Sequence, residues 1–174
     1  GLSVIPMIIG SSVNLATNIH QLKTTTLHDL KNDSALIINN EQNLRKNIES
    51  RLTELLKQKM YQQHDLSAIT QSLLHVNAGD KDILSISYVY NGQMVSSLPV
   101  PEGYDATTRP WYKDAIQSPE TMVWSEPYID IDSKQYVTTV SYATKTPATK
   151  QPIVITADIA LDKIASEIQH LKAE

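Results

Sequence analysis

From Ser11 to Lys59 the chain contains neither glycine nor proline, and this uninterrupted stretch constrains the fold more than any other feature. Its apolar residues recur mainly at spacings of three, four and seven, which places them along one face of a helix. Leu30, Ile37 and Leu44 lie a heptad apart, as in the seam of a coiled coil. The pattern therefore predicts one long helix over most of the first third of the chain.

This helical pattern weakens at residues 24–26 and 32–34, where we expect the helix to bend or break. A helix of this length predicts a rod that docks on a domain or on a second copy of the chain, such as a signalling stalk that enters from a membrane. A helix pair in an ordinary core is the alternative. Residues 2–9 are strongly apolar but too short to span a bilayer, which needs about 20 residues. They are either an apolar helix start or the outer end of a transmembrane helix.

The rest of the chain predicts an antiparallel sheet with helices beside it. Asn91-Gly92 separates two strand-like runs and is a strong hairpin signal, because both turn positions need a positive φ. Strands that follow one another through short turns form an antiparallel sheet, so the predicted class is α+β. The expected strands cover residues 83–90, 93–98, 121–128, 136–144 and 153–159, and the expected further helices cover residues 66–76, 110–117 and 161–174.

Composition argues against several classes of function. The net charge is −4 and no cluster of lysine and arginine overrides it, which argues against nucleic-acid binding. The absence of cysteine removes disulfides, thiolate catalysis and cysteine-type zinc sites. The chain has no glycine-rich phosphate loop, no nucleophile elbow and no zinc-protease motif, and its five histidines are scattered. We therefore expect no enzyme, no cofactor and no metal site.

One short segment concentrates an arginine and several aromatic residues: Tyr104, Arg109, Trp111 and Tyr112. Arginine binds a carboxylate through two parallel hydrogen bonds, and aromatic rings can wall a binding site or face a cation. The segment therefore indicates a site for the negative end of a small molecule. Taken alone, it also fits a short core helix with a surface pair between Arg109 and Asp105.

Further along the chain, Tyr128, Asp130 and Asp158 supply the opposite chemistry. A pair of aspartates neutralises an ammonium group, and a free amino acid carries an ammonium and a carboxylate on one carbon. Asp130 and Asp132 by themselves would also fit acid–base work or a calcium loop, but no glycine or later glutamate completes an EF-hand. The two groups of residues together predict a binding site for a zwitterion.

Four segments carry a common pattern, namely 104–112, 124–130, 137–141 and 155–161. Together they resemble the Cache family of extracytoplasmic sensors, and more narrowly the membrane-distal, PAS-like module of double-Cache domains. Such domains occur in methyl-accepting chemotaxis receptors and sensor histidine kinases. The resemblance covers about residue 15 to the C-terminus. It implies a long N-terminal helix followed by a PAS-like antiparallel sheet of about five strands with flanking helices.

Within that family the chain resembles an amino-acid-binding subclass. The resemblance implies that the arginine and neighbouring aromatic groups hold the ligand carboxylate, and that the second tyrosine region and the two aspartates hold its ammonium. The chain departs from the family at Asp105-Ala106-Thr107, where Asp-Pro-Arg is common, and this departure puts the rigidity of the loop in doubt. The implied ligand-binding residues are Tyr104, Arg109, Trp111, Tyr112, Tyr128, Asp130 and Asp158.

The resemblance also implies an organisation in three parts. Residues 1–60 form a membrane-emergent or stalk helix that docks on the sensor, residues 61–160 form the ligand-binding module, and residues 161–174 form a helix that leads toward a proximal module or the membrane. Double-module members continue beyond this point, so the chain fits either a single-module sensor or the first part of a double one.

The predicted function is that of an extracytoplasmic sensor domain of a membrane-anchored receptor, which binds a free amino acid without any reaction. A homodimer through the long helix is a further expectation. The alternatives are a sensor for an amine or a small carboxylate, and a dimerisation module without a small ligand. Ser85, Ser87, Tyr88 and Met122 are candidates for selectivity toward the ligand side chain.

Overall fold

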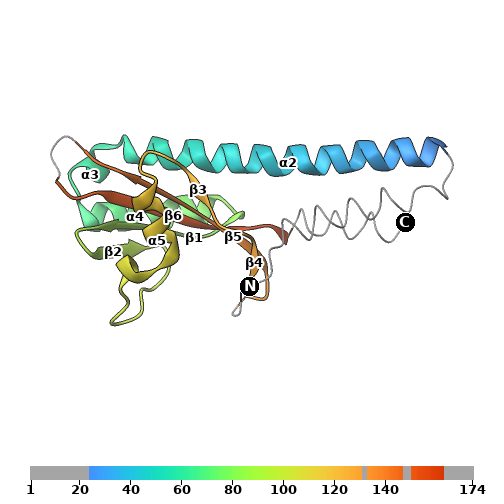
Figure 1. Cartoon of the computed structure of the whole chain (residues 1–174). Coiled ribbons are helices and arrows are strands. Elements are labelled where there is room, and N and C mark those ends of the chain that lie inside the picture. The colour runs from blue at the N-terminus through green and yellow to red at the C-terminus, as the bar shows by residue number, and fades with distance from the viewer. Residues whose placement is uncertain (1–23, 131–132, 147–149, 163–174) are drawn as a thin grey trace. The chain divides into compact units, whose positions relative to one another are not determined.

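A computed structural model describes residues 24–130, 133–146 and 150–162 and confirms the α+β class (Figure 1). The apolar residues 2–9 and the predicted closing helix beyond Asp162 lie outside these ranges. None of the helices in the described ranges has the length and apolar character that crossing a membrane requires. The elements are α2 (Thr24–Leu56), α3 (Lys59–Gln62), α4 (Leu66–Gly79), β1 (Ile83–Tyr90), β2 (Gln93–Ser96), the short 3-10 helix η2 (Ala106–Thr108), α5 (Pro110–Gln117), β3 (Val123–Trp124), β4 (Tyr128–Ile129), β5 (Tyr136–Thr144) and β6 (Ile153–Ala160).

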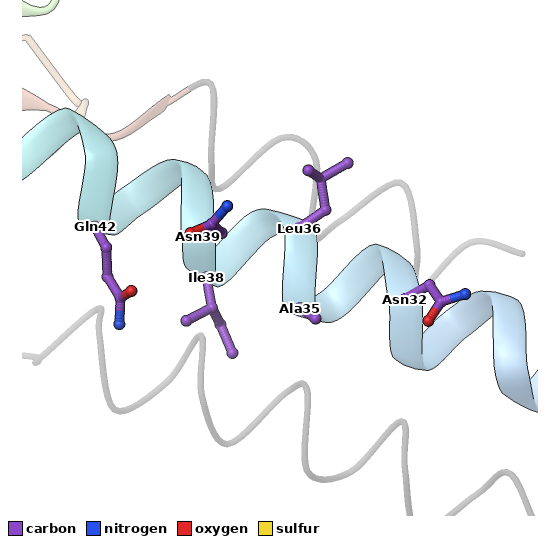
Figure 2. Close-up of a pocket in the computed structure, with 6 residues that line it drawn as sticks. All are labelled: Asn32, Ala35, Leu36, Ile38, Asn39 and Gln42. Atoms are coloured by element: carbon purple, nitrogen blue, oxygen red, sulfur yellow. The ribbon is translucent and has the colours of Figure 1, made fainter.

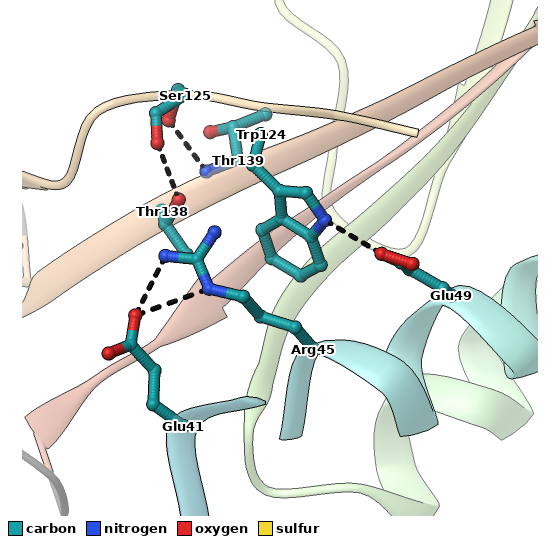
Figure 3. Close-up of polar contacts among 7 residues, drawn as sticks. All are labelled: Glu41, Arg45, Glu49, Trp124, Ser125, Thr138 and Thr139. Carbon is teal, nitrogen blue, oxygen red and sulfur yellow. Dashed lines mark hydrogen bonds and ion pairs between the residues drawn. The ribbon is translucent and has the colours of Figure 1, made fainter. Parts of the chain in front are cut away.

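The long helix α2 confirms the glycine- and proline-free pattern, but the helix does not break at residues 32–34, because α2 continues through them. Asparagine, aspartate and serine each cost only about 0.7 kcal/mol or less in a helix interior, and burial of the apolar stripe offsets that cost. Glu41 and Arg45, one turn apart, form an ion pair at 2.8 Å (Figure 3). The buried residues of α2 repeat at helical spacings: Ile37, Ile48, Leu52, Leu55 and Leu56.

The chain divides into two compact units. The first unit consists of residues 1–48, 126–137 and 161–174, and the second consists of residues 49–125 and 138–160. In the second unit the strands lie in the order β2-β1-β6-β5-β3. In the first unit, β4 pairs with the beginning of β5. The pairings of β1 with β2 and β6, and of β5 with β3 and β4, are antiparallel, as predicted.

The predicted hairpin and the predicted helix after the loop are both confirmed. Asn91 and Gly92 have φ angles of 51° and 77°, which are the left-handed values that a tight turn between β1 and β2 requires. Pro110 occupies the first turn of α5, where its missing N–H costs no hydrogen bond.

The predicted strand over residues 121–128 is instead split into β3 and β4, so the sheet of the described residues has six strands rather than about five. Pro127 has no N–H to donate to a ladder, which interrupts regular pairing. Ser125 keeps its segment on β5: its N–H donates to the carbonyl of Thr139 at 2.8 Å, and its hydroxyl oxygen accepts from the Thr139 N–H at 2.9 Å (Figure 3).

Alternation along the strands gives the sheet of the second unit two different faces. The Tyr88 face carries a buried apolar core that packs against α3 and α4; its core members include Tyr61, Ile69, Leu73, Ile86, Tyr88, Ile155 and Ala157. The Asp158 face is covered near one end by α5, which packs against β6. Its apolar part consists of Val89, Ala106, Ala115, Ala143 and Val154.

Candidate functional site

The segment that departs from the family pattern is ordered by its own hydrogen bonds. The Asp105 carboxylate accepts from the backbone N–H of Thr107 at 3.0 Å and from its hydroxyl at 2.6 Å. These two bonds lower the pKa of Asp105 and cap η2. Ala106 is only 1% exposed and belongs to the apolar cluster of the Asp158 face. The turn thus has local order without the proline that is common in the family.

Arg109 follows this turn and remains exposed. Its guanidinium carbon lies 4.6 Å from the centre of the Tyr104 ring, which is a cation–π arrangement. Among the described residues no salt bridge joins Arg109 to Asp105, so the predicted surface pair does not form. The stacked guanidinium therefore retains its N–H donors for a carboxylate.

Trp111 and Tyr112 lie in the first turn of α5 and are half-buried. Their rings meet edge to face, with centroids 6.1 Å apart and an angle of 77°. Both pack against the apolar cluster that includes Val154, and burial raises the pKa of Tyr112. The core-residue interpretation is therefore correct in part, because these rings pack as core residues and also keep an exposed portion.

Asp158 lies on β6 and is half-buried. Its Oδ1 accepts from the Thr139 hydroxyl at 2.7 Å, and its Oδ2 accepts from the Ser85 hydroxyl at 3.0 Å. Ser85 stands directly opposite Asp158 in the β1–β6 register, so both side chains project from the same face. No lysine or arginine of the described residues forms an ion pair with Asp158. The site therefore contains a negative charge that accepts hydrogen bonds from two hydroxyl groups.

The Asp158 face changes from apolar to polar along β6. Val154 packs with the aromatic residues of α5, and Asp158 lies four residues further on, about 13 Å along the strand. Between them, the Thr156 hydroxyl donates to the carbonyl of Val140 at 2.9 Å. One face of the sheet thus carries an apolar and aromatic region around Val154 and a carboxylate at Asp158.

Tyr128 and Asp130 belong to the first unit. Tyr128 is half-buried in β4 and pairs with Val137. The Asp130 carboxylate accepts from the backbone N–H of Ser133 at 2.8 Å, and hydrogen bonding to Ser133 lowers the pKa of Asp130. Asp130 thus closes its own turn. Of the seven predicted site residues, the structure places the other five on one unit: Tyr104, Arg109, Trp111, Tyr112 and Asp158.

Sequence reasoning missed Thr139 and misjudged Tyr88. Thr139 contacts Asp158 directly, and the alternation of residues 136–144 would have placed it on one face of its strand. Tyr88 lies on the opposite face, where its hydroxyl donates to the Tyr61 carbonyl at 3.1 Å, so it cannot select ligands at Asp158. Ser85 donates to Asp158 at 3.0 Å, and its role in selectivity toward the ligand side chain stays a prediction.

A hollow along α2 offers a second place to consider (Figure 2). None of the described residues that line it carries a charge. The described residues also contain no cluster of three acidic, histidine or cysteine groups that would hold a metal ion. The residues that line the hollow are Asn32, Ala35, Leu36, Ile38, Asn39 and Gln42.

The antiparallel sheet, its long leading helix and the charged face define a sensor module. The chain belongs to the family described as methyl-accepting chemotaxis protein-like, first PDC sensor domain, whose model matches residues 48–166. This match confirms the predicted relation to the sensor domains of chemotaxis receptors, a family that is not catalytic.

One relative and two solved structures illustrate the match. The chain is similar to the methyl-accepting chemotaxis protein McpC of Bacillus subtilis (strain 168), with 37% identity over 73 residues, which are 41% of this chain and 11% of McpC. The chain thus spans about a tenth of the length of that relative.

The first structure is the ligand-binding domain of the Pseudomonas aeruginosa PAO1 amino acid chemoreceptor PctC in complex with GABA. It matches this chain with a TM-score of 0.63 and 22% sequence identity. The match covers 83% of this chain and 68% of the PctC chain. The second is the ligand-binding domain of Mlp24 with asparagine, with a TM-score of 0.59 and 18% identity, covering 94% of this chain and 62% of that chain. At such identities, these two structures show the shared fold.

Proposed function

We propose that this chain is the extracytoplasmic ligand-binding domain of a chemotaxis-type receptor and that its ligand is a free amino acid. The observation that carries the proposal is the half-buried Asp158, which is held by two hydroxyl groups and is not paired with a cation among the described residues. Arg109 and the aromatic residues of α5 lie on the same unit and suit the carboxylate end. The names of PctC and Mlp24, with GABA and asparagine bound, support this ligand class.

The energetics of such a site are sufficient for sensing. A hydrogen bond to a charged group contributes about 1.5–3 kcal/mol net. Several such bonds, offset by the ordering of the ligand and the loop, reach about −8 kcal/mol, which corresponds to micromolar affinity. The bound ligand then favours one arrangement of sheet and loop, and this shift of population is the signal.

Isothermal titration calorimetry with the twenty standard amino acids tests the proposal. We expect heat from at least one of them, and Asp158→Ala and Arg109→Ala should each abolish it. Lys113→Ala and Asp114→Ala are matched controls, because both residues are exposed on α5 and should bind as the wild type does. If none of the twenty produces heat, an amino acid is not the ligand.

The same variants distinguish the neighbouring ligand classes. Unchanged affinity in Arg109→Ala would identify an amine, with Tyr128, Asp130 and Asp158 as its partners. Unchanged affinity in Asp158→Ala and Asp130→Ala would identify a small carboxylate. We keep Tyr128 and Asp130 as proposed ammonium contacts, and Asp130→Asn should weaken binding of an amino acid.

We also propose that the whole receptor is anchored in a membrane and forms a homodimer through its N-terminal helix. The proposed organisation assigns residues 1–60 to the stalk helix, 61–160 to the ligand-binding module and 161–174 to the outgoing helix. Leu36 and Ile38 on α2 are exposed apolar residues of the kind that a helix–helix contact buries. Sedimentation of the wild type and of a Leu36→Asn, Ile38→Asn variant tests the contact, and equal masses for the two would exclude it.

A further inference from the structure

The carboxylate of Asp158 is held from both sides by hydroxyl groups of the strands that flank β6. Thr139 of β5 donates to Oδ1 at 2.7 Å, and Ser85 of β1 donates to Oδ2 at 3.0 Å. A hydroxyl has a single hydrogen, and each hydroxyl uses it in this contact. Both hydroxyls therefore act as donors to the carboxylate, which keeps about two of its four acceptor positions.

In this cluster of Asp158, Ser85 and Thr139, the carboxylate presents acceptors only. It carries one negative charge, and no set of three or more acidic, histidine or cysteine groups that would hold a metal ion occurs in the part of the chain that the structure describes. Thr139 is 7% exposed, so water competes little for its bond to the carboxylate. A cluster of this kind matches a monovalent cation that is rich in N–H donors.

We infer that Ser85 and Thr139 are positioning residues for the ammonium end of the ligand and that they make the site selective for a primary ammonium over its N-methylated forms. This inference rests on the proposed amino-acid function. A primary ammonium brings three N–H donors to the oxygen cluster, and each methyl group replaces one donor with an apolar group. A site whose polar groups hydrogen-bond a substrate N–H discriminates strongly against analogues that lack it, because its own groups are then left unpaired.

The experiment compares one ligand with its own methylated forms. The probe is whichever of the twenty standard amino acids binds most tightly in calorimetry, together with its N-methyl and N,N,N-trimethyl derivatives. We expect the trimethyl form to bind the wild type about 100-fold more weakly or worse. Thr139→Val keeps the side-chain shape but removes the hydroxyl. It should weaken binding of the parent amino acid about tenfold and change binding of the trimethyl form little. The ratio of the affinity for the parent amino acid to the affinity for its trimethyl form should therefore decrease.

Two further variants separate this role from a general effect on the sheet. Thr139→Ser restores the hydroxyl and should recover both the affinity and the ratio. Thr138→Val is the matched control, because Thr138 is the adjacent, fully buried threonine, and its hydroxyl donates to the Ser125 carbonyl at 2.9 Å and not to Asp158. It should leave the ratio as in the wild type.

The outcomes distinguish this inference from the function on which it rests. If none of the twenty amino acids binds, the proposed function fails and the inference fails with it. If an amino acid binds but Thr139→Val and Ser85→Ala leave its affinity and the methylation ratio unchanged, only the inference is overturned. The inference is likewise overturned if the trimethyl form binds the wild type as well as the parent does, or if Thr138→Val changes the ratio as much as Thr139→Val.

Discussion

At the scale of single residues, His64 occupies an unusual environment. It follows α3 with a φ of 55°, and its ring stacks on Tyr90 with the centroids 3.6 Å apart. Its Nδ1 lies 2.6 Å from the hydroxyl of Tyr88, whose single hydrogen goes to the Tyr61 carbonyl. Nδ1 therefore donates, and Nε2 is a buried acceptor with no hydrogen-bond partner among the described residues.

Burial lowers the pKa of His64 below its ordinary value of 6.5, and this gives a prediction for stability against pH. Above 6.5, His64 is neutral in both states and its full contribution is present. As the pH falls through 6.5, the unfolded chain takes up the proton before the folded domain does, so stability is lost. The thermal midpoint should therefore fall between about pH 7.5 and pH 5.5, and it should fall less in His64→Asn, since asparagine tolerates the left-handed backbone.

The histidine prediction has a matched control on the surface. His75 is exposed on α4, and His75→Asn should lose as much stability between the two pH values as the wild type does. An equal loss in His64→Asn and the wild type would show that His64 does not carry the effect.

Individual site residues differ in how far the sequence could predict them. Residue type and neighbouring residues singled out Arg109 and Asp158 as candidates for the two charged ends of a ligand, and their role in binding stays a prediction. Thr139 was not predictable in this way, since a hydroxyl in a β-strand has many possible partners and its bond to Asp158 depends on strand order. The sequence pattern gives the faces of a strand but not which strands are neighbours.

At the scale of elements, a hydrogen bond ties α2 to the sheet within the second unit. The Trp124 Nε1–H of β3 donates to the Glu49 carboxylate at 3.2 Å (Figure 3). Trp124 is directly opposite Val140 in the β3–β5 register, next to the residue pair Ser125 and Thr139 that leads to Asp158. The hydrogen bond between Trp124 and Glu49 is therefore connected to Asp158 through Ser125 and Thr139.

Trp124→Phe should destabilise the domain by about 1–2 kcal/mol, because it removes a hydrogen bond to a charged group as well as part of a packed ring. Glu49→Gln should cost less, since the amide keeps an acceptor oxygen. Chemical denaturation of the two single variants and the double variant measures the coupling between the residues. Glu54→Ala is the control, because its ion pair with Lys57 is exposed and should contribute little. If the losses in free energy of unfolding of the two single variants add up to that of the double variant, the hydrogen bond between Trp124 and Glu49 does not stabilise the domain.

Elements were predictable where a local signal has one physical meaning. The glycine- and proline-free stretch gave α2, and Asn91-Gly92 gave the hairpin. One failure lay where tertiary contacts override local preference, since α2 continues through residues 32–34. The other concerned a local signal, because Pro127 lacks an N–H for the ladder and interrupts the strand expected over residues 121–128. Neither the burial of the α2 stripe nor the bond between Ser125 and Thr139 can be read from neighbouring residues.

At the scale of the whole molecule, the two compact units are not separate along the chain. The chain passes between them several times, and both α2 and β5 continue without interruption from one unit into the other. Unfolding of one unit therefore removes hydrogen-bonded turns or ladder pairs at the boundary of the other. This connectivity predicts a single cooperative unfolding transition in spite of the division into two units.

Two spectroscopic probes test this prediction, because they report on different parts of the chain. Both tryptophans of the sequence, Trp111 and Trp124, belong to the second unit, so their fluorescence follows that unit alone. Far-UV circular dichroism follows helix content, to which the 33-residue α2 contributes most among the described helices. Both probes should give one denaturation midpoint, and an amino acid at about 100 times its Kd should raise the stability reported by each by about 2.7 kcal/mol. Separate midpoints, or a ligand shift confined to the fluorescence, would show that the units unfold independently and that binding energy stays in the second.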